Sequence, residues 1–541
     1  MTPALPNRLA LQIPSPWWLG IGVCVLLMTL PQWVVLASWL NPVHEHWPHL
    51  RQYVLPAALA NSALLVAGVV AVSLMLGVPL AWLIARYRFP GHRQWRWALM
   101  LPLAMPAYVL AFVMVGLLDF TGPLQSLLRQ WWPQLRLAEI RSLGGAVLVL
   151  ALSFYPYIYL LARDAFASQS QQSLEVAASL GLSPQRRWWR VLLPQARPAL
   201  VAAGLLVAME TLADFGAVSV FNIDTLSVAI YKAWSGLFSL QAASQIAAVL
   251  VLLALAMMGL ERWQRGRRSY SHSRGRPLET RQLHGWRGLL ATMACALVWL
   301  LAFGLPLGQL LIWGWQVAAT DLDSRLPLFI FNSLQLASLA ALLVVALALL
   351  LAYGERQLRQ PAASLAIQLA STGYAMPGAV LAVGFFLPLQ WLDNQLLALT
   401  GSSSPTLLKG TLLLILLGLA TRFLSVGLAP LQAGLQRISP AQEMAAASLG
   451  VAGWARLRRL HLPLLAPSIT TAALLTFVDV MKEMPITLMT RPFGWDTLAV
   501  RVFEMTSEGE WQRAALPGLA IVFAGLLPVM LLGRGRHGGQ P

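Results

Sequence analysis

Four acidic residues form two matched pairs inside long apolar stretches of the sequence. Glu210 and Asp214 are four residues apart, and so are Asp479 and Glu483. Residues at this spacing share one face of a helix, so each pair is expected to present both carboxyl groups to the same side. Carboxylates in a low-dielectric interior need a cation, a hydrogen-bond donor or water, because they do not all stay ionised unaided. Lys482 can face Asp479, three residues away, and would neutralise one acid if these residues make structural polar contacts.

Two interpretations of these residues stay open. In the first, they make buried polar contacts that join two parts of the protein. In the second, they line a pathway that accommodates a cationic substrate, since ionisable residues within a membrane mark substrate routes. The pathway candidates are Glu210, Asp214, Asp479, Lys482 and Glu483.

The composition indicates that these acids lie in a membrane protein. Of 541 residues, 58% are hydrophobic and only 11% are charged, which excludes a soluble enzyme and a disordered chain. Cys24 and Cys295 lie in apolar runs and support neither a disulfide framework nor a zinc site. We expect an all-α polytopic fold with about twelve transmembrane helices, the first of them retained rather than removed as a signal peptide. The predicted spans are 17–40, 58–85, 98–118, 143–162, 199–220, 243–260, 288–314, 330–353, 366–390, 408–430, 467–489 and 514–533.

The basic residues predict the orientation. With a cytoplasmic N-terminus, 27 Lys and Arg residues, Arg422 among them, fall on the inner side and ten on the outer side. This bias places both termini in the cytoplasm. The net charge of +17 is thereby explained as a topology signal, without nucleic-acid binding.

Landmarks recur in the same order along the chain and predict two homologous six-helix halves. The matched landmarks are Asn61-Ser62 with Asn332-Ser333, Met105-Pro106 with Met376-Pro377, Gly181 with Gly450, and Asp224-Thr225-Leu226 with Asp496-Thr497-Leu498. The predicted organisation is an N-terminal segment with the first helix (1–57), a first transmembrane domain (58–262), a basic cytoplasmic linker (263–287), a segment with the first helix of the second half and an outer loop (288–329), a second transmembrane domain (330–533) and a cytoplasmic tail (534–541). The linker is expected to be a solvated tether, with contact to anionic lipid as the alternative.

A cytoplasmic loop is duplicated with the halves. Residues 175–181 read EVAASLG and residues 444–450 read MAAASLG, and a Leu-Pro pair ends thirteen residues after each glycine. Gly181 is expected to end one helix in the left-handed conformation, and Pro194 is expected to end a second, short helix. The alternative is an amphipathic helix at the membrane interface.

The pattern Glu-x-Ala-Ala-x-x-Gly with Leu-Pro thirteen residues on resembles the coupling-loop signature of bacterial binding-protein-dependent ABC importer permeases of the type I, fused two-half form. This resemblance implies that the loops dock onto ATP-hydrolysing subunits. It assigns that role to Glu175, Ala177, Ala178, Gly181, Pro194, Glu443, Ala445, Ala446, Gly450 and Pro463. Met444 stands where the second loop would carry its acid, which suggests unequal loops.

The resemblance also implies which partners and cofactors belong to the system. None of Lys232, Lys409 and Lys482 follows a glycine, so the chain has no phosphate-binding loop. ATP and Mg²⁺ are therefore expected on a separate nucleotide-binding subunit, present in two copies, with no cofactor in this chain. The other expected partners are a periplasmic solute-binding protein and the lipid bilayer.

Residues 210–234 and 479–503 resemble the corresponding segments of ferric-iron uptake permeases. This resemblance implies iron(III) as the substrate and the bacterial inner membrane as the location, and hard carboxylate oxygens also suit a trivalent ion. Thiamine is the alternative within the family, and an ion-coupled secondary transporter is the alternative from another class. The three histidines at 44, 46 and 49 are expected to lie in a surface loop, with a metal site as the less favoured interpretation.

Overall fold

The computed structural model describes residues 16–41, 47–134, 138–266, 279–320, 325–400, 407–408 and 410–535. Within these ranges the chain is almost wholly helical, and strands β1 (Tyr87–Arg88) and β2 (Arg281–Gln282) form one short parallel pair. Eleven helical runs are long and apolar enough to cross a membrane. The twelfth predicted span, 514–533, is helix α25 (Ala515–Gly535), of which Ala515–Leu526 counts as a shorter apolar helix. The prediction of an all-α polytopic membrane protein is confirmed.

The first half and its preceding helix contain thirteen α-helices and four irregular helical segments. They are α1 (Pro16–Ala37), η1 (Ser38–Leu40), α2 (Trp47–His49), η2 (Leu50–Val54), α3 (Leu55–Arg86), α4 (His92–Ala98), η3 (Leu101–Ala104), α5 (Ala107–Leu118), α6 (Pro123–Trp131), α7 (Leu143–Ala167), α8 (Gln171–Ser179), α9 (Pro184–Arg187), η4 (Trp188–Leu192), α10 (Leu193–Ala213), α11 (Gly216–Val220), α12 (Leu226–Ser235) and α13 (Leu240–Gly266).

From its long helix α16 onwards the second half repeats the order that starts at α3, except that α6 has no counterpart. It comprises α14 (Trp286–Trp299), η5 (Leu300–Gly304), α15 (Leu305–Thr320), α16 (Leu326–Leu358), α17 (Pro361–Ala370), η6 (Ser371–Ala375), α18 (Gly378–Thr400), α19 (Leu412–Arg437), α20 (Pro440–Ser448), α21 (Gly453–Arg456), η7 (Leu457–His461), α22 (Leu462–Lys482), α23 (Pro485–Thr490), α24 (Leu498–Ser507) and α25.

The matched sequence landmarks contact each other in the same way in both halves. The side-chain amide of Asn61 donates to the carbonyl of Asp224 at 2.9 Å, and that of Asn332 donates to Asp496 at 3.0 Å. The next residue of each pair, a serine, accepts a hydrogen bond from the first backbone N–H of α12 or α24, at 3.1 and 2.8 Å. The repeat is therefore structural as well as sequential.

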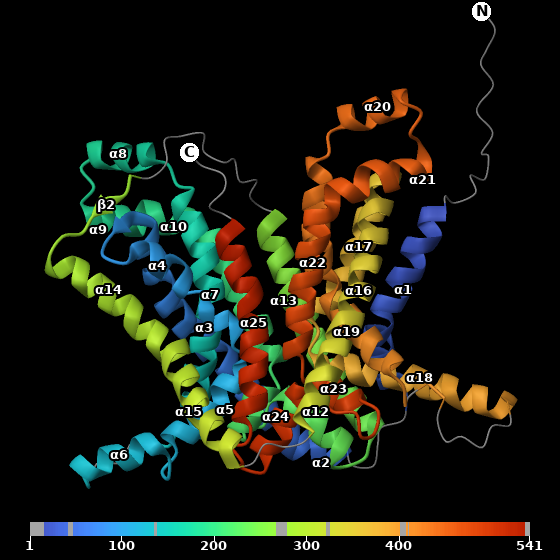
Figure 1. Cartoon of the computed structure of the whole chain (residues 1–541), viewed down its shortest axis with the longest axis horizontal. Coiled ribbons are helices and arrows are strands. Elements are labelled where there is room, and N and C mark those ends of the chain that lie inside the picture. The colour runs from blue at the N-terminus through green and yellow to red at the C-terminus, as the bar shows by residue number, and fades with distance from the viewer. Residues whose placement is uncertain are drawn as a thin grey trace, which may run out of the picture.

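The first helix of each half packs against the other half. Helix α1 contacts α16, α17 and α18, while α14 and α15 contact α4 and α5, so the two helices lie on opposite flanks of the molecule (Figure 1). Gly384 of α18 permits the close approach of α1, because a Cβ atom there would lie 2.7 Å from Pro31 Cα. Each half therefore has the first helix of the other half packed against it.

Proline breaks two of the predicted spans. Residues 98–118 and 366–390 were expected to be continuous helices, but Met105 and Met376 have extended backbones, with ψ of 121° and 130°. A residue that precedes proline is disfavoured in the helical region, and Pro106 and Pro377 follow these two. Each expected span is therefore a short segment (η3 or η6) followed by a new helix (α5 or α18).

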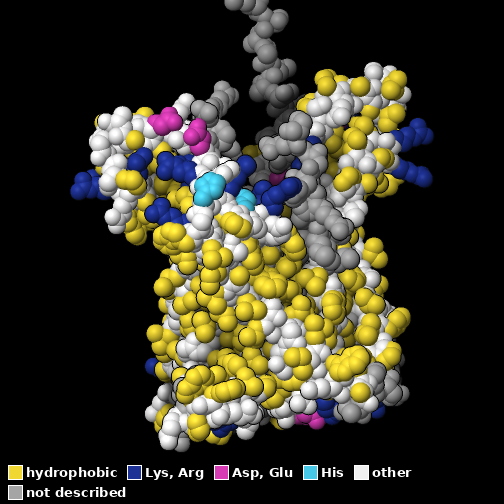
Figure 2. Space-filling view, turned by 60° about the vertical axis from the view of Figure 1, so that its left-hand side comes forward, with side chains coloured by type: hydrophobic (Ala, Val, Ile, Leu, Met, Phe, Trp, Pro, Cys, Tyr) yellow, Lys and Arg dark blue, Asp and Glu magenta, His cyan; other side chains and the backbone are white. Residues whose placement is uncertain are grey.

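The surface and the arrangement of the ends agree with the predicted topology. Exposed apolar side chains form a broad band around the body, and Lys and Arg gather above it (Figure 2). Helices α8 and α20 lie at the same end of the molecule, α1 begins there, and α25 runs towards it (Figure 1). This is the end that the basic residues assign to the cytoplasm.

Candidate functional site: a cavity between the halves

A cavity of about 180 Å³ lies where the two halves meet, and all five pathway candidates line it. The acids Glu210 and Asp214 come from the first half, and Asp479 and Glu483 come from the second. The other polar side chains in its wall are Lys482, Arg422, Ser153, Tyr108, Tyr157 and Tyr374. The sequence therefore identified the acids that share one site, but it missed Arg422 and the hydroxyl groups.

The acids of each pair do not lie on one helix face, contrary to expectation. Helix α10 ends at Ala213, and Asp214 is extended, with ψ of 129°. Its Oδ1 atom accepts from the N–H groups of Ala217 and Val218 at 3.0 and 3.2 Å, so it caps α11. Glu483 follows α22 in the same way and accepts from Ile486 at 2.9 Å. The predicted spans 199–220 and 467–489 were too long, because each contains this break.

Two hydrogen bonds cross the cavity reciprocally. Tyr374 of η6 donates to Glu210 of α10 at 2.9 Å, and Lys482 of α22 donates to the carbonyl of Leu103 in η3 at 2.8 Å. Tyr374 and Leu103 each stand two residues before the Met-Pro pair of their half. Among the described residues, no ion pair within 4 Å joins Lys482 to Asp479, although the charge of Lys482 acts on that carboxyl group.

Arg422 was predicted at the cytoplasmic face, yet it lies within α19, ten residues after Leu412, which is about 15 Å along the helix. Its Nη1 atom lies 3.8 Å from Glu483 Oε1. Gly378 makes room for this contact, since a Cβ atom there would lie 2.7 Å from Nη1 and 2.8 Å from Oε1. An arginine inside the predicted span 408–430 was the available sequence signal.

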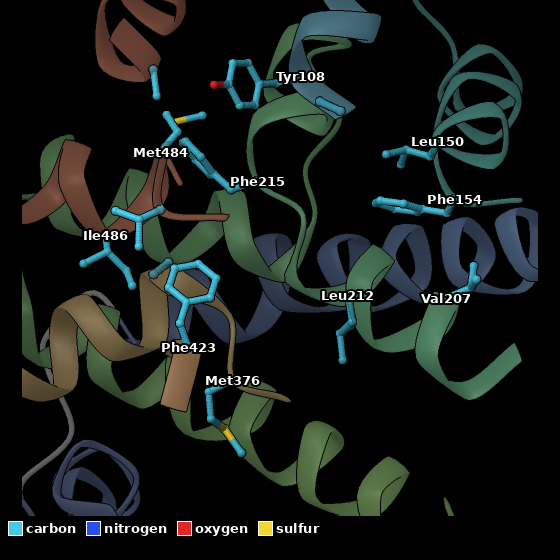
Figure 3. Close-up of a cluster of buried hydrophobic side chains, with 14 of the residues drawn as sticks. Tyr108, Leu150, Phe154, Val207, Leu212, Phe215, Met376, Phe423, Met484 and Ile486 are labelled. Atoms are coloured by element: carbon cyan, nitrogen blue, oxygen red, sulfur yellow. The ribbon is translucent and has the colours of Figure 1, made fainter. Parts of the chain in front are cut away.

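Apolar side chains close one part of the cavity wall. Tyr108, Phe215 and Met484 converge in Figure 3, and Phe215 and Met484 directly follow the two chain breaks at Asp214 and Glu483. Gly216 allows this packing, because a Cβ atom there would lie 2.8 Å from both Met484 Cε and Tyr108 Cβ. The acids are therefore bordered by a tightly packed apolar surface.

The duplicated loop ends its first helix as predicted. Gly181 and Gly450 both have φ of +76°. In the first loop, Gly181 N–H donates to Ala178 and Leu182 N–H to Ala177, and the second loop repeats this with Ala447 and Ala446 as acceptors. These are the two hydrogen bonds of a Schellman motif. Ala447, and not Ala445, is thus the counterpart of Ala178, and the sequence interpretation overlooked it.

The prolines of the loops do not end a helix. Pro194 and Pro463 lie in the first turn of α10 and α22, and π-helical segments η4 and η7 run directly into them. A π-turn accommodates a residue that cannot donate its N–H. The helical runs Pro184–Ala213 and Gly453–Lys482 are therefore continuous from the loop to the cavity.

The two loops differ in how they use acidic side chains. Glu175 is exposed on α8, and its counterpart on α20, Met444, is 66% exposed. Glu443 is buried instead, and it accepts hydrogen bonds from Arg356 Nε at 2.8 Å and interacts with His461 Nε2 at 3.1 Å. Glu443 was predicted to face a partner subunit, and in this structure it does not.

The cluster of Glu443, Arg356 and His461 replaces an apolar contact of the first half. The residues 269 positions before Glu443 and His461 are Leu174 and Leu192, which pack together with Trp82 and Trp188. Burial acts to raise the pKa of Glu443, but the hydrogen bond and charge of Arg356, together with His461, outweigh it and hold that pKa below its ordinary value. Charged side chains therefore hold the second loop in place, whereas apolar contacts hold the first.

The described end of the linker is not a free tether. Leu283 N–H donates to the carbonyl of Arg88 at 2.8 Å beside the β1–β2 pair. Arg86 donates to the carbonyl of Glu279 and, at 3.3 Å, to Gln171 at the start of α8. Residues 267–278 of the linker lie outside the described residues. The linker therefore contacts the first loop directly.

The histidine cluster stays a prediction. Two of its members, at positions 44 and 46, lie outside the described residues. His49 ends α2, and its ring lies 5.1 Å from that of Tyr53.

Comparison with known proteins agrees with this architecture. Residues 77–268 match the family described as "Binding-protein-dependent transport system inner membrane component". The chain is 28% identical over 483 residues to the Fe(3+)-transport system permease protein FbpB 2 of Haemophilus influenzae, which covers 88% of this chain and 89% of that protein. It is 24% identical to the putative ferric transport system permease protein FbpB 1 of the same organism, over 71% of this chain and 62% of that protein. A 2-aminoethylphosphonate permease protein, PhnV of Salmonella typhimurium, is 35% identical over 25% of the chain and 50% of its own length.

The fold, the duplicated loops and these matches define a multi-pass transport permease of the inner membrane. More specifically, the chain is similar to the permeases of binding-protein-dependent ABC importers, and it carries two structurally matched transmembrane halves in one polypeptide.

Proposed function

We propose that this permease moves iron(III) across the inner membrane. The observation that carries the proposal is the cavity, which is lined by four carboxyl groups from matched positions of the two halves. Carboxylate and phenol oxygens are hard ligands of the kind that hard cations prefer. The name of the Haemophilus influenzae relative, which aligns along most of the chain, supports the same substrate.

ATP hydrolysis is assigned to a separate nucleotide-binding subunit, in two copies, which would carry ATP and Mg²⁺. Helices α8 and α20 supply the two docking positions, at one end of the molecule. Leu180 and Leu449 are exposed at equivalent places beside the left-handed glycines and offer each copy an apolar contact. The proposed docking residues are Glu175, Ala178 and Gly181 in the first loop, with Ala446, Ala447 and Gly450 in the second. Ala177 is only 4% exposed and, like Glu443, is too buried to face a partner in this structure.

The proposed mechanism follows from the continuity of the helices. A periplasmic binding protein would deliver the ion to the outer face, and closure of the ATPase pair would move α8 and α20. The runs Pro184–Ala213 and Gly453–Lys482 connect those loops to the cavity without a break. A displacement of the loops would therefore reach Glu210 and Asp479 and shift the access of the cavity between the two sides.

Uptake in a deletion strain tests the substrate. Cells that lack this gene, with and without a plasmid copy, are supplied with radiolabelled iron(III) or thiamine. We expect the plasmid to restore iron uptake, and depletion of ATP at a maintained membrane potential to abolish it. Restored thiamine uptake with unchanged iron uptake would identify a thiamine permease. Uptake that depends on an ion gradient and does not depend on ATP would identify a secondary transporter.

A further inference from the structure

Arg422 lines the cavity together with all four acids. It is the charge that acts on all four carboxyl groups, those of Glu210, Asp214, Asp479 and Glu483. Its side chain is 17% exposed, and its Nη1 atom has no hydrogen-bond partner among the described residues. An arginine keeps its positive charge in any protein environment. The guanidinium therefore balances carboxylates that it does not bind firmly.

Arg422 has no basic counterpart in the first half. The position 269 residues earlier is Ser153, which also lines the cavity, and Lys482 likewise corresponds to Ala213. The four acids are thus shared equally between the halves, whereas both basic side chains come from the second half. In the described part of the chain, no three carboxylate, imidazole or thiolate groups converge closely enough to hold a metal ion. Arg422 stands in the same cavity wall as these separated acids, with its Nη1 atom 3.8 Å from Glu483 Oε1.

Tyr108 supplies an independent observation. The residue is only 7% exposed and lines the cavity, yet its hydroxyl has no hydrogen-bond partner among the described residues. The hydroxyl turns away from Leu150 and Phe154 in Figure 3. A buried hydroxyl without a partner is unfavourable, so a ligand that reached this oxygen from the cavity would relieve that cost.

We propose that the cavity is a transient binding site for a hard trivalent cation, in which Arg422 is the resident counter-ion that the cation displaces. The proposal rests on the proposed function and deepens it. The entering ion would take oxygen ligands from Glu483, Tyr108 and the acids of the opposite half, and the arginine side chain would swing aside. Because the guanidinium stays charged, it repels the bound ion and keeps the site weak. A transport site must release its ion as well as bind it.

Terbium(III) provides the probe, since it is trivalent, prefers oxygen ligands and luminesces when a nearby tyrosine or tryptophan transfers energy to it. The purified full-length permease in lipid nanodiscs is titrated with Tb³⁺. Arg422→Gln is expected to tighten Tb³⁺ binding about ten-fold, equivalent to ~1.4 kcal/mol, and Arg422→Lys to leave it near the wild-type value. Arg437→Gln is the matched control, because it removes the same charge from an exposed position at the end of the same helix.

Further variants keep the proposal falsifiable if Arg422→Gln does not fold. In the wild-type background, Glu483→Gln and Tyr108→Phe should each weaken Tb³⁺ binding severalfold, while Tyr53→Phe, at an exposed tyrosine outside the cavity, should not. Unchanged binding in Glu483→Gln, or Arg422→Gln no tighter than Arg437→Gln, would overturn the proposal. A failure of iron uptake alongside the expected Tb³⁺ results would instead reject only iron as the substrate.

Discussion

The hydroxyl group of Tyr374 donates a 2.9 Å hydrogen bond to Glu210, and this bond joins the second half of the permease to the first across the cavity. Its reciprocal partner, the bond from Lys482 to the carbonyl of Leu103, crosses in the opposite sense. Both involve the short segments η3 and η6 that precede the Met-Pro breaks. The interface between the halves is therefore polar where the cavity lies.

Tyr374→Phe should destabilise the permease by about 1–3 kcal/mol, because Glu210 loses its donor in a buried setting. The measurement is the thermal unfolding midpoint of the purified protein in detergent. Tyr53→Phe removes a hydroxyl from an exposed ring and serves as the control. Equal midpoints for the two variants would contradict the assigned role of Tyr374.

Replacement of Gly181 or Gly450 by alanine should cost about 1 kcal/mol through the backbone alone. Both glycines have φ of +76°, and no atom lies within 4 Å of where a Cβ would be added, so no clash contributes. We expect lower ATP-driven uptake with normal assembly in the membrane. Gly22→Ala in α1 is the matched control, since that site is equally open and lacks the positive φ. Uptake equal to that of Gly22→Ala would argue against a role of these helix ends in coupling.

Much of this architecture could be predicted from the sequence, for physical reasons that the landmarks make clear. Apolar length predicted the spans, and glycine spacing predicted the left-handed ends at Gly181 and Gly450. The breaks after Ala213 and Lys482 were not predicted, because hydropathy continues through them and the caps formed by Asp214 and Glu483 depend on backbone geometry.

Arg422 and Glu443 were misplaced for a related reason. An arginine within an apolar run can be assigned to the nearest cytoplasmic end by charge counting, although the fold places it at the cavity. Glu443 differs from the aligned position by a single residue, and on a helix that shift turns the side chain from the exposed face to the buried one. Only the packing of Arg356 and His461 reveals its partner.

Glu443→Ala should destabilise the second loop by about 2 kcal/mol, as expected for loss of hydrogen bonds to a charged group. The cost is limited because Arg356 keeps the carbonyls of Leu435 and Ile438 as acceptors. Glu175→Ala, at an exposed site, should change stability by no more than about 0.5 kcal/mol. Hydrogen exchange of α20 and α8 measures both effects. Equal protection of α20 in the two variants would contradict the anchoring role of Glu443.

The contribution of Glu443 to the stability of the second loop should depend on pH. The pKa of Glu443 lies below its ordinary value of about 4.3, so its ionised form stabilises the folded loop at neutral pH, and that contribution is lost as pH falls through the lowered pKa. Glu443→Gln cannot titrate. The stability difference between wild type and Glu443→Gln should therefore shrink on acidification below about pH 4. A difference that stays constant would show that the carboxylate is not responsible.

Uptake by proteoliposomes that contain the permease, its ATPase subunits and its binding protein tests most directly whether the shared cavity is the transport route. Glu210→Gln combined with Asp479→Gln removes one acid from each half and should reduce ATP-driven iron(III) uptake by about ten-fold or more, the equivalent of at least ~1.4 kcal/mol. ATP hydrolysis should continue in the same vesicles, because the loops are intact. Undiminished uptake by this variant, assembled at the wild-type level, would show that the ion travels elsewhere.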